Sequence, residues 1–421
     1  MTPLQICFVA PNALPVIDPA VPGPIGGIET RSWLFARTLA KRTDVDMNFV
    51  VRDAVRPRQQ VIESVRIQAL VEPLASIRQS IGAFVARQPA FPWIGLRRWS
   101  WNLLWQIPLL AAAKLSPYPH GLSGGPDPFL RDLETDVFCT FGVNPASASA
   151  VATAHERKLP AVLVLGSDGD LDARFLEGAS YANQYGDRGD MSLRLLQAAD
   201  TIVVQTPQQQ QLLKERFGRD GILVPNPIHV EEWDQQLTMP PPFSLPAERY
   251  VLWIGRADYA PKQPLKAYDI ARQLPETHFV MVVNPYDRDV EETLQQTRPA
   301  NVTLVPRVLP SQIASLYARA SALLNTSSFE GFPNTFLQAV LSRIPIISLS
   351  VDPRLRAELP LAECMEGSID SAVGRLHEIA EQGTAGKSAA LRPIVIAEHD
   401  ASQCAERLLN VLRQVTPSIR L

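Results

Sequence analysis

Short apolar segments that alternate with helix-like patterns constrain the fold of this chain more than any other feature of its sequence. The strand-like segments form two series, at 4–10, 45–51, 136–142, 161–166 and 201–206, and then at 250–255, 278–284, 302–307, 322–327 and 345–350. Helical periodicity lies between them at 28–41, 145–157, 207–217, 265–274, 310–320 and 335–342. Strands that are apolar on both faces and alternate with helices are typical of a parallel sheet covered by helices on both sides. The sequence therefore predicts an α/β protein with two doubly wound domains that face each other across a central cleft.

A proline-rich segment separates the two series. With 421 residues, the chain is longer than one hydrophobic core usually spans. Three consecutive prolines at 240–242 cannot stand inside a regular element, so we predict a linker at 228–245. The first domain is expected at 1–227 and the second at 246–395. A helical tail at 396–421 can pack on either domain, including back on the first.

The composition argues against several classes of protein. Hydrophobic residues make up 46% and charged residues 20%, and the net charge of -3 argues against a broad nucleic-acid-binding surface. The four cysteines lie far apart, so we expect reduced thiols in a cytoplasmic protein. No basic region precedes the first strand, so no signal peptide is expected. The longest apolar segment, 103–115, contains a proline and is too short to span a bilayer.

Two pairs of residues that follow predicted strands suit an anionic ligand, because ligands of such sheets bind beyond the carboxyl ends of the strands. Gly26 and Gly27 precede a helix, where glycines let the backbone approach a ligand and the first N–H groups face an anion. Arg256 follows a strand directly and Lys262 comes six residues later, so the two could hold a diphosphate. Without a ligand, the glycines would be a flexible turn and the cations would be solvated surface charges.

The segment NTSSFEGFPNTFLQAV at 325–340 places one acid, Glu330, between a strand and a helix. We expect the N-cap of this helix near Asn334. The backbone at the helix start would then face a bound phosphate; it comprises Gly331, Phe332, Pro333, Asn334 and Thr335. Phosphate would repel a carboxylate, so Glu330 is expected to contact hydroxyl groups beside it. Without a ligand, Glu330 would be a helix-start acid favoured by the helix dipole, and Gln338 would be an exposed helix residue.

These features together resemble the retaining GT4 family of glycosyltransferases, which have the GT-B fold. The glycine pair, the Arg256 and Lys262 pair, and the segment FEGFPNTFLQAVLSRIPII occur in the family's order. The segment ADTIVVQTPQQQQLL, followed by VPNPI, resembles the family where the first domain ends. The similarity runs from about residue 4 to 415 and is weakest at about 55–135. It implies two Rossmann-like domains, a nucleotide-sugar donor on the second domain, a hydroxyl acceptor on the first, and transfer with retention.

The resemblance also implies roles for individual residues. Gly26 and Gly27 would approach the donor diphosphate or the acceptor. Arg256 and Lys262 would neutralise the diphosphate as it leaves. Glu330 would contact the donor sugar, while the backbone from Gly331 to Thr335 would hold phosphate. The donor is expected to be linked to UDP or GDP, with no separate cofactor.

Two positions depart from the family's pattern. Gln338 stands where members carry a second glutamate that binds ribose hydroxyls, and an amide offers one acceptor and one donor group instead of two acceptor oxygens. Asp168 lies in a region where members often have a histidine, and it could orient an acceptor hydroxyl as part of the catalytic set. Asp168 and Asp170 imitate a metal-binding D-x-D pair. The cations and the helix start already supply positive charge, so no metal is expected.

The segment at 91–110 is rich in aromatic residues and cations. It contains Trp93, Trp99, Trp101 and Trp105 together with Arg97 and Arg98. We expect a helix that packs its tryptophans on the first sheet, because helices of α/β domains are often this apolar. The alternative is a peripheral contact with the inner face of a membrane, where aromatic residues beside cations are favoured.

Three functions are consistent with the sequence. The first is a retaining hexosyltransferase-type enzyme that moves a sugar from a nucleotide-diphosphate sugar to a hydroxyl group of a polysaccharide, glycolipid or small molecule. The second is another enzyme on the same fold, such as a sugar-nucleotide epimerase or a phosphorylase, because a fold does not fix a function. The third is a non-catalytic module that binds sugar nucleotides.

Overall fold

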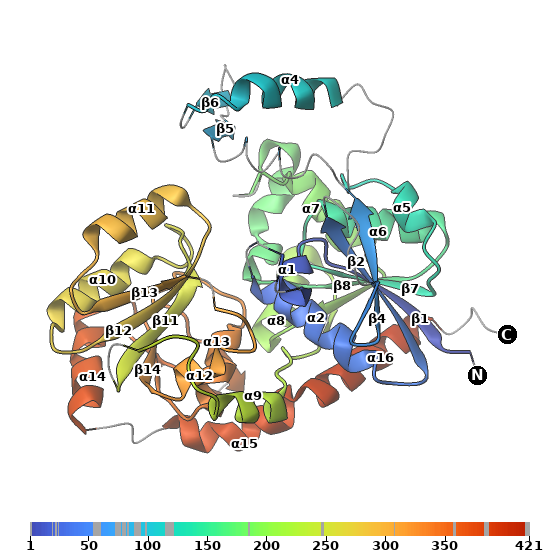
Figure 1. Ribbon diagram of the computed structural model, residues 1–421. Coiled ribbons are helices and arrows are strands. Elements are labelled where there is room, and N and C mark those ends of the chain that lie inside the picture. The colour runs from blue at the N-terminus through green and yellow to red at the C-terminus, as the bar shows by residue number, and fades with distance from the viewer. Residues whose placement is uncertain are drawn as a thin grey trace.

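A computed structural model describes residues 2–416, except for 19, 22, 24, 54–59, 72–76, 78–80, 82–83, 88–93, 97–98, 114–121, 184–185, 246–247, 307, 357–358 and 383–386. Two sheets stand side by side, each with helices around it, and the C-terminal helices run below both (Figure 1). This is the pair of doubly wound domains that the sequence predicts.

The first sheet has the strand order β10-β9-β8-β7-β1-β2-β4-β3. Its strands are β1 (Leu4–Val9), β2 (Val45–Asp53), β3 (Val61–Ile62), β4 (Val65–Val71), β7 (Val137–Phe141), β8 (Ala161–Val164), β9 (Thr201–Val204) and β10 (Gly221–Leu223). All pair in parallel except β3 with β4. The five predicted strands are confirmed to within two residues. The edge strands β3 and β10 and the neighbouring β4 were not predicted, because they are short or alternate polar with apolar residues.

Helices cover both faces of this sheet. They are α1 (Leu14–Ile17), α2 (Gly27–Leu39), α5 (Pro128–Arg131), α6 (Pro145–Glu156), α7 (Gly189–Ala198) and α8 (Pro207–Phe217), with the 3-10 segments η1 (Asp168–Leu171) and η2 (Ala173–Ser180). Asn144 and Thr206 accept hydrogen bonds at the starts of α6 and α8, each followed by a proline at the first helical position. These caps explain why both helices begin where their sequence patterns begin.

The second sheet has the order β13-β12-β11-β14-β15-β18 and is parallel throughout. Its strands are β11 (Tyr250–Arg256), β12 (Phe279–Asn284), β13 (Val302–Pro306), β14 (Ala320–Asn325), β15 (Ile346–Ser348) and β18 (Glu363–Cys364). The helices are α10 (Pro264–Gln273), α11 (Arg288–Thr297), α12 (Ala314–Tyr317), α13 (Asn334–Leu341) and α14 (Ile369–Gln382), and β16 (Arg354–Arg356) pairs with β17 (Leu359–Pro360).

The helix predicted at 310–320 is wrong in extent, since only α12 forms there. Gln312 bonds back to Leu309 and Leu316 to Ile313, so the chain before α12 winds in tighter turns than an α-helix. The last residue of the prediction, Ala320, belongs instead to β14.

Two long-range connections hold the domains together. The predicted linker contains α9 (Val230–Leu237), whose Val230 and Trp233 belong to the core of the second domain. After α15 (Lys387–His399), α16 (Ala401–Val415) returns to the first domain and packs Leu408 and Leu412 into its core. Of the two packings that the sequence left open for the C-terminal helix, the structure shows the one on the first domain. The boundary predicted between 395 and 396 falls inside α15, and the domain limits stay predictions.

A separate layer lies above the first domain (Figure 1). It contains a hairpin of β5 (Val85–Arg87) and β6 (Ile94–Leu96) together with α4 (Leu103–Ala113). The expected packing of tryptophans on the first sheet is wrong: Trp99 is 53% exposed, Trp101 75% and Trp105 52%. Trp93, Arg97 and Arg98 lie outside the described residues. No described helix is long and apolar enough to cross a membrane.

Candidate active site

The predicted site residues follow strands of both sheets and meet where the two domains face each other. Lys262 and Glu330 form an ion pair in which the lysine Nζ contacts the glutamate Oε1. Their side chains are 22% and 15% exposed, so the pair is largely screened from water. Ser327 Oγ donates a second hydrogen bond of 2.7 Å to the same carboxylate oxygen. The structure therefore joins two predicted site residues in a direct contact that sequence spacing could not reveal.

The loop that carries Lys262 is fixed by hydrogen bonds to its backbone. Asp258 Oδ1 accepts from the Lys262 N–H at 2.7 Å, and Thr326 Oγ1 donates to the Lys262 carbonyl at 2.8 Å. Thr326 directly follows β14, so the lysine loop is anchored to the strand that leads to Glu330. This anchoring fixes the backbone from which the Lys262 side chain extends to Glu330.

Arg256 ends β11 and is held by two neighbours. Its guanidinium lies 3.2 Å from the Asp258 carboxylate and 4.3 Å from the centre of the Tyr286 ring. Asp258 is almost completely buried, and burial raises its pKa, although the Lys262 amide, Arg256 and Lys262 each lower it. The same aspartate thus positions both cations that the sequence assigned to a diphosphate.

The helix α13 starts one residue earlier than predicted. Its N-cap is Pro333 and its first helical residue is Asn334, so the N-cap lies next to Asn334, near which it was predicted. The Asn334 side chain does not cap the helix; its Oδ1 accepts from Asn226 Nδ2 at 3.2 Å. Within the described part of the chain, the N–H groups of Asn334 and Thr335 have no backbone acceptor. They remain suited to an anion at the helix start.

Gln338 is not the exposed helix residue that the sequence allowed. Its Oε1 accepts a 3.0 Å hydrogen bond from the hydroxyl of Tyr317, a completely buried tyrosine. The acceptor oxygen is therefore engaged within the protein, and the amide N–H₂ can donate to a ligand. A glutamate at this position could satisfy Tyr317 with one oxygen and keep the other for a hydroxyl group.

Asp168 and Asp170 face different partners. Asp168 Oδ1 accepts from Gln209 Nε2 at 3.0 Å, whereas Asp170 accepts the backbone N–H of Gly166. Burial raises the pKa of Asp168; the Gln209 hydrogen bond opposes that shift, and the nearby Glu330 carboxylate adds to it. Asp168 is thus close to the ion pair of the second domain, while Asp170 is a structural cap of its own loop.

The glycine pair begins α2, with Gly26 as N-cap and Gly27 as the first helical residue. A residue that the sequence did not single out, Glu29, reaches this turn: its carboxylate interacts with the Gly26 backbone and with Arg256 across the domain interface. Burial is the largest influence on Glu29 and raises its pKa. Its position in the first turn after two glycines was the only available signal.

Gly331 brings the two domains into contact. A Cβ atom at this position would lie 3.0 Å from Ser167 Cα and 3.5 Å from Asp168 N. Only a glycine allows the backbone of the second domain to approach the first domain this closely. The loop after Glu330 therefore closes directly on the loop that carries Asp168.

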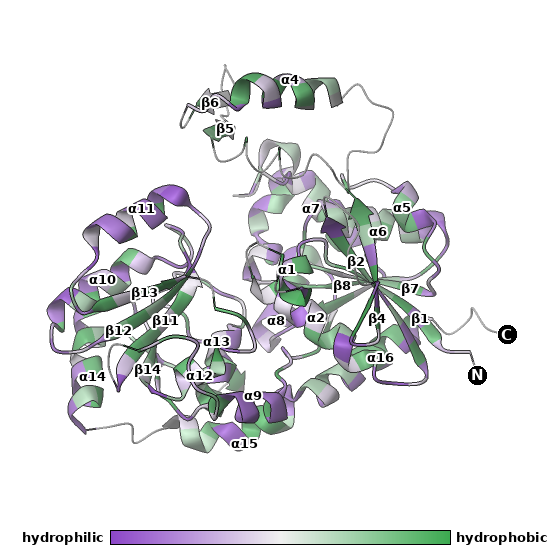
Figure 2. Cartoon of the chain, in the orientation of Figure 1, coloured by the Kyte–Doolittle hydropathy of each residue, from purple (hydrophilic) through white to green (hydrophobic). Residues whose placement is uncertain are grey.

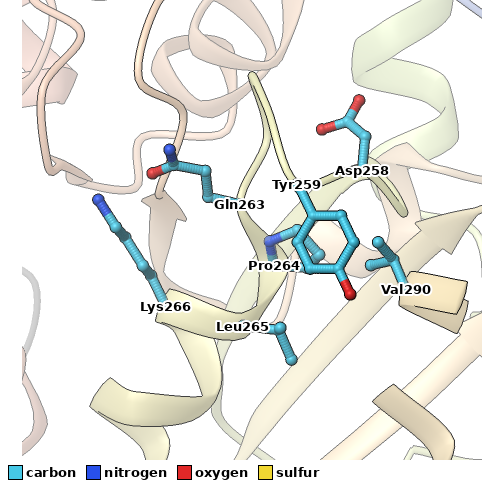
Figure 3. A pocket seen from close by; sticks show the side chains of 7 residues that line it. All are labelled: Asp258, Tyr259, Gln263, Pro264, Leu265, Lys266 and Val290. Carbon is cyan, nitrogen blue, oxygen red and sulfur yellow. The ribbon is translucent and has the colours of Figure 1, made fainter. Parts of the chain in front are cut away.

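A cavity of about 200 Å³ lies on the other side of the lysine loop. Figure 3 shows its lining side chains, which come from the loop after β11, the start of α10 and α11: Asp258, Tyr259, Gln263, Pro264, Leu265, Lys266 and Val290. Glu330 and Asp168 are not among them. This cavity is next to the predicted site and shares Asp258 with it, but it does not contain the ion pair.

Known proteins resemble the chain in two ways. Residues 248–359 match the family model described as "Glycosyl transferases group 1". A sucrose-phosphate synthase from Thermosynechococcus elongatus is 16% identical with a TM-score of 0.62, and the match covers 99% of this chain and 100% of that one. An E. coli trehalose-6-phosphate protein bound with UDP-2-fluoro glucose is 11% identical with a TM-score of 0.62, covering 97% and 99%.

A third structure, of a trehalose-6-phosphate synthase studied for glycosyltransfer with retention, is 12% identical with a TM-score of 0.62 and covers 97% and 99%. No curated protein sequence matches the chain. The family match and the full-length structural matches confirm the resemblance and the GT-B fold predicted from the sequence.

Proposed function

Because residues 248–359 match the group 1 glycosyltransferase model and the whole chain has the GT-B fold, we propose that the protein moves a sugar from a nucleoside-diphosphate sugar to a hydroxyl acceptor with retention of anomeric configuration. The observation that carries this proposal is the Lys262–Glu330 ion pair, with Arg256 linked to the Lys262 loop through Asp258. The start of α13 follows Glu330 by four residues. Two cations and a helix start suit a pyrophosphate, and a carboxylate beside them suits the sugar.

The chemistry of the leaving group supports these roles. When the bond between sugar and diphosphate breaks, negative charge grows on the phosphate oxygens. Donors that are already aimed at this charge stabilise the transition state more than the ground state. Lys262 is held by its loop and Arg256 by Asp258 and Tyr286, so neither has to be ordered during the reaction. We assign to both the stabilisation of the departing diphosphate.

Glu330 has a different proposed role. In the structure its carboxylate pairs with Lys262 and accepts from Ser327. A bound diphosphate would share Lys262 with it, and Glu330 would contact sugar hydroxyls and stabilise positive charge that develops on the sugar ring. In transfer on one face, the leaving phosphate takes the proton of the acceptor hydroxyl, so no side chain has to act as a nucleophile.

The first domain would supply the acceptor side. Asp168 lies close to Glu330 and its pKa is raised, so it is suited to accept a hydrogen bond from an acceptor hydroxyl. Glu29, in the first turn of α2 after Gly26 and Gly27, interacts with Arg256 from the other side of the interface. Phe332 and Pro333 would contribute backbone and shape to the donor site, and Gln338 would donate its amide to the nucleotide ribose.

The partners in this proposal are a donor linked to UDP or GDP and an acceptor with a free hydroxyl group, without nucleic acid. The proposed location is the cytoplasm, at the inner face of a membrane when residues 91–110 are engaged. Four free cysteines, of which Cys7, Cys139 and Cys404 are buried, are consistent with a reducing compartment.

A thermal-shift screen separates this proposal from its competitors. UDP, GDP and ADP are tested first, followed by their sugar conjugates, with Lys262→Ala as the variant and Lys266→Ala as a matched control on the neighbouring helix. We expect one nucleoside diphosphate to raise the Tm of the wild type and of the control but not of Lys262→Ala. Consumption of a sugar nucleotide without an acceptor, with release of an epimer, would favour an epimerase. A pyridoxal absorbance band would favour a phosphorylase, and binding without turnover would favour a binding module.

A further inference from the structure

The segment from β6 through α4 exposes an unusual number of large apolar side chains. We call this set the Trp face. It comprises Leu96, Trp99, Trp101, Leu104, Trp105, Ile107 and Leu109, which are 40–75% exposed. Figure 2 shows apolar residues along most of α4, which stands apart from both sheets. Isolated exposed apolar residues are common, but a contiguous group of this kind marks an interaction surface.

The distribution of polar and apolar side chains on α4 is the reverse of that on a surface helix of a water-soluble domain. Its polar Gln106 is only 5% exposed, whereas its neighbours Trp105 and Ile107 are 52% and 48% exposed. The inward face is therefore partly polar and the outward face is apolar. This polarity stabilises the helix only where the surroundings of the outward face are apolar too.

The tryptophans expose their apolar rings, and one of them has its polar N–H hydrogen-bonded within the protein. Trp99 and Trp101 pack edge to face with ring centres 5.9 Å apart. The indole N–H of Trp105 donates to Asn102 Oδ1 at 3.3 Å. Tryptophan is favoured at the boundary between lipid headgroups and acyl chains, because its ring is apolar and its N–H is polar.

The charge of the surrounding sequence points to the chemistry of the partner. Residues 73–126 contain five lysines and arginines and no aspartate or glutamate, although the whole chain has a net charge of -3. An anionic surface would be attracted to this segment. A second copy of the chain would instead bring two cationic segments together, which disfavours self-association through the Trp face.

We propose that the Trp face docks the protein on the surface of an anionic lipid bilayer, with α4 lying in the plane of the interface. With 11 residues, α4 is about 16 Å long, far shorter than the ~30 Å of a hydrocarbon core. It can therefore lie on the bilayer but not cross it. This inference does not depend on the proposed transferase function, since it rests on a surface that is separate from the site residues.

Co-sedimentation of the full chain with lipid vesicles tests the proposal. Vesicles of phosphatidylcholine alone are compared with vesicles that contain phosphatidylglycerol, at low and high salt. We expect the wild type to bind the anionic vesicles, and salt to weaken the binding because the attraction is partly electrostatic. Trp99→Ala/Trp101→Ala should lower the binding by about tenfold or more. Because the two side chains are exposed, the Tm of this double variant should match that of the wild type.

Two matched controls replace exposed apolar residues elsewhere. Leu176→Ala and Met239→Ala, at sites 57% and 58% exposed, should bind vesicles as the wild type does. Failure of the wild type to bind anionic vesicles, or equal binding by the tryptophan variant, would overturn the proposal. So would sedimentation velocity that shows a dimer in the wild type and a monomer in the tryptophan variant, because the Trp face would then be a contact between copies.

Discussion

The side-chain amide of Asn226 donates a 2.8 Å hydrogen bond to the backbone carbonyl of Phe332. This bond connects the end of the first domain to the loop that follows Glu330. The Oδ1 of the same asparagine accepts from the buried Arg31 of α2 at 2.8 Å, and its backbone carbonyl accepts from His399 Nδ1 at 2.8 Å. One asparagine at the end of the first domain therefore links α2, α15 and the start of α13.

Removal of this link is expected to destabilise the protein and weaken donor binding together. In Asn226→Ala the Phe332 carbonyl and the Arg31 guanidinium each lose a buried partner, at a cost of about 1–3 kcal/mol. We expect a Tm lower by several degrees and a weaker response to nucleoside diphosphate. Asn183→Ala, which removes hydrogen bonds to Asp187 within one loop, serves as the control and should leave nucleotide binding unchanged. An unchanged nucleotide affinity in Asn226→Ala would contradict the link to the donor loop.

The close approach at Gly331 predicts a defect in turnover. The added methyl group of Gly331→Ala would meet Ser167 Cα at 3.0 Å and Gln209 Nε2 at 3.2 Å, so the facing loop of the first domain has to move by a few tenths of an ångström. A displacement of this size should lower kcat by about 10–100-fold. Gly374→Ala lies inside α14 with no atom within 4 Å and should raise stability by about 0.5–1 kcal/mol without changing kcat. Normal turnover by Gly331→Ala would show that the two loops do not meet during the reaction.

The pairing of Gln338 with Tyr317 predicts a gain from one substitution. In Gln338→Glu one carboxylate oxygen can still accept from the Tyr317 hydroxyl, and the other becomes available to a ribose hydroxyl. A hydrogen bond to a charged group contributes about 1.5 kcal/mol, which corresponds to roughly tenfold tighter binding of the nucleoside diphosphate. Calorimetric titration measures this directly. Equal or weaker binding would place the ribose away from Gln338.

The buried His399 is expected to make the protein less stable in acid. Burial lowers its pKa to about 4, although the Asn226 carbonyl and Glu398 oppose the shift and Arg407 adds to it. Because the folded pKa lies below the ordinary value of about 6.5, the unfolded state takes up the proton first. The stabilisation that neutral His399 adds to the free energy of unfolding is complete above pH 6.5. It is lost as the pH falls toward 4, by up to about 3 kcal/mol.

His399→Gln tests this dependence, since glutamine keeps a donor and does not titrate. Denaturant unfolding is measured for both proteins between pH 7.5 and 4.5. The wild type should be the more stable at pH 7.5, and its advantage should shrink as the pH falls. A constant difference between the two proteins across this range would exclude His399 as the source.

The sequence was sufficient for most of the fold because buried parallel strands and capped helices leave strong local patterns. Central strands such as β1 and β11 are apolar throughout, and α8 is bounded by a Thr206 cap and a Gly218 in the left-handed region. Edge strand β10 has only three residues, and α12 has only four, so neither carries a full period.

The candidate site was predictable only in part. Glycines, cations and the acid after β14 could be located because they follow strands. Contacts between residues that are distant in the sequence could not be predicted. Lys262 and Glu330 are 68 positions apart, and Asn226 is 106 positions from Phe332. The Trp face was misassigned because periodicity shows that a helix is apolar but not whether another element covers it.

Calorimetric titration of UDP and GDP into the wild type and into Lys262→Ala tests the central claim most directly. If the ion pair of Lys262 and Glu330 marks the pyrophosphate site, one of the two nucleotides binds the wild type, and Lys262→Ala binds it at least about tenfold more weakly. Lys266→Ala, on the adjacent helix, should bind as the wild type does. Binding of the same strength by Lys262→Ala, or no binding of either nucleotide to the wild type, would contradict the account.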